Sequence, residues 1–168
     1  YKDFADQQKL RIIETDENIS VAFLAYTYGT NGIQVPEEQE YLVNLIDRGD
    51  IKEEVERAQQ QADVVVLQLH FGNEYERLPS EEQKALAQYA ADLGVHAVIG
   101  HHPHVLQPAE WLLGKDGNET LVIYSLGNFI SNQQELYQRI GGVFGFTITK
   151  KIIDEQVVIK LHSPSLLP

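Results

Sequence analysis

Cysteine and methionine are both absent from this chain of 168 residues. Without cysteine there are no disulfides and no thiolate metal ligands, so any metal ion must be held by histidine, carboxylate or amide side chains, or by water. The lack of cysteine suits an extracellular and a cytosolic setting about equally. Because the chain starts with tyrosine and has no methionine, we expect it to be a processed or excised part of a longer protein.

Basic residues are scarce, with 13 Lys+Arg against 25 Asp+Glu and a formal net charge of −12. This charge repels phosphate backbones and anionic lipids, so we expect no nucleic-acid partner. No apolar run approaches the roughly 20 residues of a membrane-spanning helix, and the first ten residues lack the basic-then-apolar pattern of a signal peptide. The hydrophobic content of 43% is sufficient for a substantial core, and we expect residues 1–168 to form one domain.

Apolar runs and turn residues divide the chain into strands and helices. We predict helices at 37–47, at 51–62 and after a capping box formed by Ser80 and Gln83, the last of them ending at Gly94. Two alternating runs predict a hairpin that turns near Asp154 and Glu155. The predicted strands are 21–28, 64–69, 95–100, a strand and turn within 121–129, 143–150 and 156–162. This order predicts an α/β sandwich with parallel strands and a late antiparallel hairpin.

Half of the six histidines lie in one turn, GHHPHV, at residues 100–105. This turn and His70 both follow predicted parallel strands, whose carboxyl ends meet at the same edge of a sheet. His102 and His104 alternate along the loop, so their imidazoles can project to one side, and imidazole suits zinc, iron and manganese. Pro103 should bias His102 toward extended backbone. We therefore predict His70, His102 and His104 as metal ligands; a histidine cluster without a function is the alternative.

Three further residues are candidates for the same site. His101 is expected to point away from the ligand pair and to face the substrate or hydrogen-bond the ligands. Glu74 could be a ligand, a partner that orients an imidazole, or a solvated acid, and we favour the second role. Asn128 can join them from the next strand. His96 and His162 are expected to be structural or solvent-exposed, without a role in the site.

The segments AFLAYTYGTNG, VVVLQLHFGNEY, GHHPHVLQ and IYSLGNFI resemble the CapA/PgsA type of poly-γ-glutamate capsule biosynthesis proteins over about residues 19–148. That family is similar in fold to the calcineurin-like metallophosphoesterases, which are sandwiches of mixed sheets flanked by helices with two metal ions at strand ends. The resemblance matches His70 to an isolated motif histidine, and His102 and His104 to a terminal ligand pair. Glu74 and Asn128 also match positions of the family pattern.

The earlier Gly-Asp and Asn-Asn-His segments of such proteins have no counterpart in this sequence. The chain therefore resembles the C-terminal portion of the family domain, and part of the site is absent from it. We expect one divalent ion, manganese, zinc or iron, or none in this chain alone. A bridged pair of ions, which needs a shared carboxylate, is not expected.

The resemblance implies a metal-dependent, phosphoesterase-like hydrolase in the complete protein and an inactive fragment here. In that reaction His101 and Glu74 would handle protons and Asn128 would contact the substrate. The alternative is a non-catalytic subunit of a membrane-bound capsule synthase that binds polymer or partner proteins. The implied partners are poly-γ-glutamate or another anionic polymer, the membrane subunits of the synthase and a second copy of the chain. The implied location is the outer face of the membrane in the bacterial cell envelope.

Overall fold

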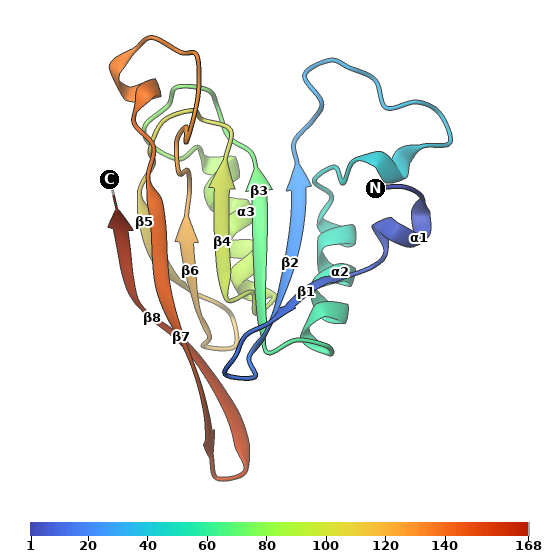
Figure 1. Ribbon diagram of the computed structural model, residues 1–168, viewed down its shortest axis with the longest axis vertical. Helices are drawn as coiled ribbons and strands as arrows, with labels where there is room; N and C mark the ends of the chain where they lie inside the picture. The colour runs from blue at the N-terminus through green and yellow to red at the C-terminus, as the bar shows by residue number, and fades with distance from the viewer. Residues whose placement is uncertain (168) are drawn as a thin grey trace.

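The computed structural model describes residues 1–167 as a six-stranded mixed sheet, a separate two-stranded hairpin and flanking helices (Figure 1). The strands of the large sheet are β1 Arg11–Glu14, β2 Ser20–Thr27, β3 Val64–His70, β4 Ala97–His101, β5 Ala109–Leu113 and β6 Glu119–Ile123. No helix within residues 1–167 is long and apolar enough to cross a membrane.

The large sheet has the order β1-β2-β3-β4-β6-β5. The four inner strands are parallel, and the two edge strands, β1 and β5, pair antiparallel to their neighbours. The carboxyl ends of β2, β3 and β4 therefore point to one edge of the sheet, and the loops that follow these strands all leave from that edge (Figure 1). These parallel inner strands confirm the predicted α/β arrangement with parallel strands. The edge strands were not predicted because they are short and mostly exposed, which weakens the alternating apolar signal.

Two helices, α2 Arg48–Gln59 and α3 Glu81–Asp92, cover one face of the sheet. Asp47 caps α2 by accepting hydrogen bonds from two backbone N–H groups, and the predicted capping box of Ser80 and Gln83 begins α3. Apolar side chains of both helices pack on alternate residues of the inner strands, because successive residues of a strand point to opposite faces of the sheet. These two predicted helices are confirmed.

The opposite face is covered in part by the hairpin of β7 Val143–Ile153 and β8 Gln156–Leu167. Asp154 and Glu155 both have positive φ, 49° and 64°, as a tight hairpin turn demands. Phe144, Phe146 and Leu161 pack against the second set of alternating strand residues. The turn extends beyond the edge of the sheet opposite to the loops (Figure 1). The late antiparallel hairpin is therefore confirmed, and the core has two layers, one on each face of the sheet.

The helix predicted at 37–47 is wrong. The structure has only the short 3-10 helix η1 Glu40–Leu42 there, and the residues after it are held against the end of β2. The Thr27 N–H donates to the carbonyl of Asn44, and the Ile46 N–H donates to the carbonyl of Thr27. These tertiary backbone bonds outweigh a modest helical pattern. Two other short elements, α1 Phe4–Gln7 and the 3-10 helix η2 Leu136–Arg139, were not predicted.

Candidate metal centre

The carboxyl ends of β3 and β4 bring the histidines together. His70 and His101 are register partners at the last residues of the two strands. The Phe71 N–H donates to the carbonyl of His101 at 3.0 Å, which holds the two strand ends together as the chains leave the sheet. The turn that carries His102 and His104 follows directly, so all four side chains lie at one edge of the sheet, as predicted.

His102 lies at the centre of this group of rings. Its ring centroid is 4.8 Å from that of His70, 6.1 Å from that of His104 and 4.5 Å from that of Tyr28. The backbone of His102 is not extended, contrary to the expectation from Pro103, because its φ is 102°. His104 also has a positive φ, 58°. Both residues therefore lie in the positive-φ region, which few non-glycine residues adopt, in a turn where the rings pack together.

Glu74 joins His102 and His104 in the closest group of ligand atoms. One donor atom from each of the three residues lies within 4.8 Å of the others, and Glu74 Oε1 is 4.0 Å from His104 Nε2. The adjacent Tyr75 N–H donates to the carbonyl of Pro103 at 2.8 Å, which fixes the 71–80 loop against the histidine turn. A carboxylate and two imidazoles form a donor set that suits zinc, iron or manganese.

Asn128 fixes the orientation of the His104 ring. Its Oδ1 lies 2.8 Å from His104 Nδ1, while its Nδ2 donates to the carbonyls of His104 and Gln138 and to Gln133 Oε1. Because an amide oxygen only accepts, His104 Nδ1 is the donor in this contact, which leaves Nε2 as the ring atom that can bind a metal ion. A ligand histidine typically donates its second N–H in this way. In the structure, Asn128 therefore orients a candidate ligand from behind.

Burial lowers the pKa of His70, His101 and His102. For His70 the neighbouring histidines lower the pKa further, while for His102 the charge of Glu74 opposes the effect of burial. These rings are therefore neutral near pH 7, and the neutral imidazole is the form that binds a metal ion.

The structure separates the remaining histidines from this group. His96 Nδ1 accepts the Val65 N–H at 3.1 Å, so its role is to join β3 to the start of β4. His162 lies on the hairpin, where its ring bonds Thr149 and Ser163. Sequence reasoning missed Tyr28, whose ring contacts that of His102 and whose N–H donates to the carbonyl of His70. Tyr28 is the last residue of the predicted strand 21–28, and this position at a strand end could have identified it as a neighbour of the histidines.

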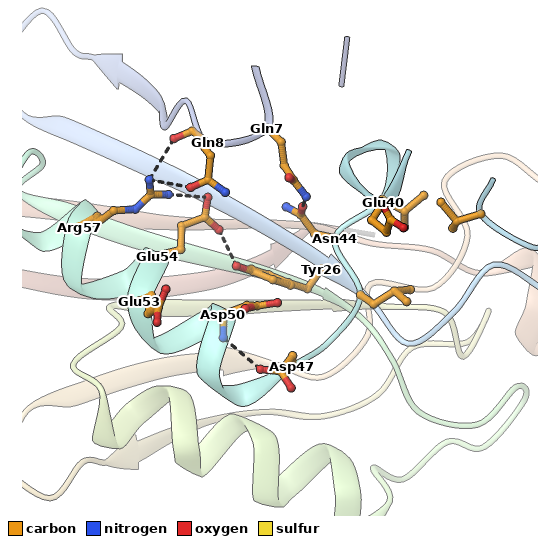
Figure 2. A pocket seen from close by; sticks show the side chains of 13 residues that line it. Gln7, Gln8, Tyr26, Glu40, Asn44, Asp47, Asp50, Glu53, Glu54 and Arg57 are labelled. Atoms are coloured by element: carbon orange, nitrogen blue, oxygen red, sulfur yellow. Dashed lines mark hydrogen bonds and ion pairs between the residues drawn. The ribbon is translucent and has the colours of Figure 1, made fainter. Parts of the chain in front are cut away.

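A separate cavity, of about 410 Å³, lies between α1, the segment before α2, and α2 itself (Figure 2). Within it, the Tyr26 hydroxyl donates to Glu54 at 2.7 Å, and Arg57 bonds the backbone carbonyl and side chain of Gln8. Its lining is rich in carboxylates: Glu40, Asp47, Asp50, Glu53 and Glu54. These carboxylates repel anions, and the cavity contains none of the histidines that lie at the ends of β3 and β4.

Comparison with known sequences supports one family. The family model described as bacterial capsule synthesis protein PGA_cap matches residues 1–133, so the match starts earlier and ends earlier than the predicted range of 19–148. The PGA biosynthesis protein CapA of Bacillus subtilis is 43% identical over 79 residues, and the capsule biosynthesis protein CapA of Bacillus anthracis is 46% identical over 72 residues. The matched segments cover 47% and 43% of this chain but only 20% and 16% of the relatives.

The fold also has a counterpart among solved structures. A 5′-nucleotidase candidate from Staphylococcus aureus, crystallised with α-ketoglutarate, superposes with a TM-score of 0.54 at 18% identity. The superposition covers 95% of this chain and 29% of that protein. At this identity the likeness concerns the fold alone. It agrees with the predicted α/β fold class, a mixed sheet with flanking helices and a late antiparallel hairpin.

Proposed function

Since this chain belongs to the PGA_cap family of bacterial capsule synthesis proteins, we propose that it holds one divalent cation through Glu74, His102 and His104 and serves metallophosphoesterase-like chemistry in capsule biosynthesis. The observation that carries the proposal is the convergence of three donor atoms within 4.8 Å at the loop edge of the sheet. His70, whose ring lies beside that of His102, is proposed as an additional ligand.

The side chains present fit such an ion. His104 offers Nε2 because its Nδ1–H is donated to Asn128, and Glu74 supplies a carboxylate beside the two imidazoles. A bound divalent ion would polarise a substrate oxygen and lower the pKa of a bound water. His101, paired with His70 in register, is proposed to transfer protons. Because Glu74 is now proposed as a ligand, the proton-handling role that the sequence suggested for both His101 and Glu74 is proposed for His101 alone.

We further propose poly-γ-glutamate, or another anionic polymer, as the ligand of the complete protein. A cation at the histidine cluster would reconcile a chain of net charge −12 with a polyanion, because it provides a local positive charge where the two meet. The family relationship is the basis for proposing the membrane subunits of a capsule synthase as partners and the outer face of the cell envelope as the location.

Metal content tests the proposal directly. The chain, purified without chelators and without a histidine tag, should contain about one equivalent of manganese, zinc or iron by elemental mass spectrometry. The His102→Ala/His104→Ala variant should contain none, whereas His162→Ala, which changes a hairpin histidine, should keep its metal. Absence of metal from the unchanged chain after incubation with each ion would contradict the proposal. Polymer binding that survives in the double variant would favour a non-catalytic binding subunit instead.

A further inference from the structure

The middle of the loop that carries Glu74 has no apolar anchor of its own. The loop, residues 71–80, connects β3 to α3, and none of its residues from 73 to 78 is buried. The two large apolar side chains of this stretch, Tyr75 and Leu78, are 47% and 71% exposed. Burial of apolar surface therefore contributes little to the conformation of residues 73–78, and their position depends on hydrogen bonds to other parts of the chain.

The buried side chain of Gln107 supplies two of these hydrogen bonds. Gln107 follows the histidine turn and is 7% exposed. Its Nε2 donates to the carbonyl of Glu76 at 2.8 Å and to the carbonyl of Leu78 at 3.1 Å. The backbone N–H of Gln107 donates to the carbonyl of Ser125 at 3.1 Å, two residues after the end of β6. A residue fixed to the sheet thus uses both N–H groups of its amide on one short stretch of loop backbone.

Gln83, in the first turn of α3, connects this amide to both ends of the loop. Gln83 is 1% exposed, its Nε2 donates to Gln107 Oε1 at 2.9 Å, and its Oε1 accepts from the Ser80 N–H at 3.0 Å. A Cβ atom at Gly72 would overlap the Gln83 side chain, so the start of the loop passes directly against it. Removing one amide from this buried network leaves its partners unpaired, which is costly in the protein interior.

The stretch that Gln107 holds lies next to Glu74 in the chain. Between them, the Tyr75 N–H donates to the carbonyl of Pro103 at 2.8 Å, in the middle of the histidine turn. From this position the Oε1 of Glu74 lies 4.0 Å from His104 Nε2. Because a chain segment moves with its neighbours, displacement of residues 76–78 would also withdraw the Glu74 carboxylate from the two histidines.

From this geometry we infer that Gln107 is a positioning residue, which holds Glu74 beside His102 and His104 through the backbone of the 71–80 loop. Its amide bonds the loop and Gln83, and it acts on the proposed ion through Glu74. The inference rests on the proposed function, because Gln107 can affect metal affinity only if Glu74 is a ligand. Groups that orient metal ligands typically contribute 10- to 100-fold to metal affinity. Loss of the Gln107 amide should therefore weaken metal binding about tenfold, and no more than Glu74→Ala does.

Competition with a chelating dye for Zn²⁺ tests the inference. Gln107→Met keeps the length of the side chain but donates no hydrogen bond, and it should bind Zn²⁺ about tenfold more weakly than the unchanged chain. Gln88→Met, the same change at an amide that donates to the Leu113 carbonyl, should keep the affinity of the unchanged chain. In the Glu74→Ala background, Gln107→Met should cause no further loss, because the two residues act on the ion in series. Gln107→Asn, a milder change that keeps a shorter amide, should show a smaller loss and replaces Gln107→Met if that variant does not fold.

Amide hydrogen exchange separates this inference from the metal proposal, because it follows the loop without any metal. The Tyr75 N–H should exchange faster in Gln107→Met than in Gln88→Met, while the amides of β3 and β4 stay equally protected. If the unchanged chain binds no Zn²⁺ and yet this difference is present, only the metal proposal fails. Equal exchange of the Tyr75 N–H in the two variants, an unchanged Zn²⁺ affinity in Gln107→Met, or an equal loss of affinity with and without Glu74 would each overturn the inference.

Discussion

Gly100 lies directly before the histidine turn, and its replacement by alanine should destabilise the protein substantially. A Cβ atom at this position would lie 1.9 Å from the backbone oxygen of Tyr124, 2.6 Å from its carbonyl carbon and 2.8 Å from Phe71 Cε1. Ordinary contacts between heavy atoms are about 3.5 Å. The obstacle is the backbone that follows β6, not a flexible side chain, so β4 and that segment must separate.

Overpacking of a core typically costs about 1–3 kcal/mol, and a clash with backbone belongs at the upper end. We therefore expect Gly100→Ala to lower the free energy of unfolding by about 3 kcal/mol. For a chain of this size, about 2–4 °C per kcal/mol gives a decrease in Tm of roughly 6–12 °C. The variant should also bind metal more weakly, because the displaced strand end leads directly into His102 and His104.

Thermal and urea unfolding measure the effect, with Gly29→Ala as the matched control. A Cβ atom at Gly29 would have no neighbouring atom within 4 Å, and the backbone there is not left-handed, so alanine should change the stability by less than about 0.5 kcal/mol. If Gly100→Ala unfolded at the same temperature as Gly29→Ala, the close approach of β4 to the Tyr124 backbone would be refuted.

Two further predictions concern Asn128, at the loop edge of the sheet, and His96, directly before β4. Asn128→Ala should lower the metal affinity about 10- to 100-fold, because His104 loses the amide that orients its ring, whereas Asn128→Asp should retain much of the affinity. Competition with a chelating dye measures the affinity of both variants. An Asn128→Ala affinity equal to that of the unchanged chain would refute the orienting role. Burial lowers the pKa of His96, so its contribution to stability is present above its ordinary pKa of about 6.5 and is lost as pH falls below that value. Urea unfolding from pH 7.5 to 5 should show this loss in the unchanged chain and less of it in His96→Gln, and identical slopes would exclude His96 as a cause.

The regular elements were largely predictable because they depend on local patterns. The continuous apolar run 64–69 indicated a strand buried on both faces, and Ser80 with Gln83 indicated the start of α3. The alternation in 143–162 predicted the hairpin and its turn. The helix at 37–47 failed because backbone bonds to Thr27, distant in sequence, hold that segment in another conformation.

The sequence by itself determined that His70 and the histidine turn would lie at one edge of the sheet, because parallel strands joined by a helix must end on the same side. Only the tertiary structure decided which atoms converge there. The 71–80 loop brings Glu74 to His102 and His104, and the segment after β6 brings Asn128 to His104. Packing with Tyr28 and His70 accompanies the left-handed backbone of His102. Local periodicity reports which face of an element is buried, whereas loop conformations depend on contacts between segments far apart in the chain.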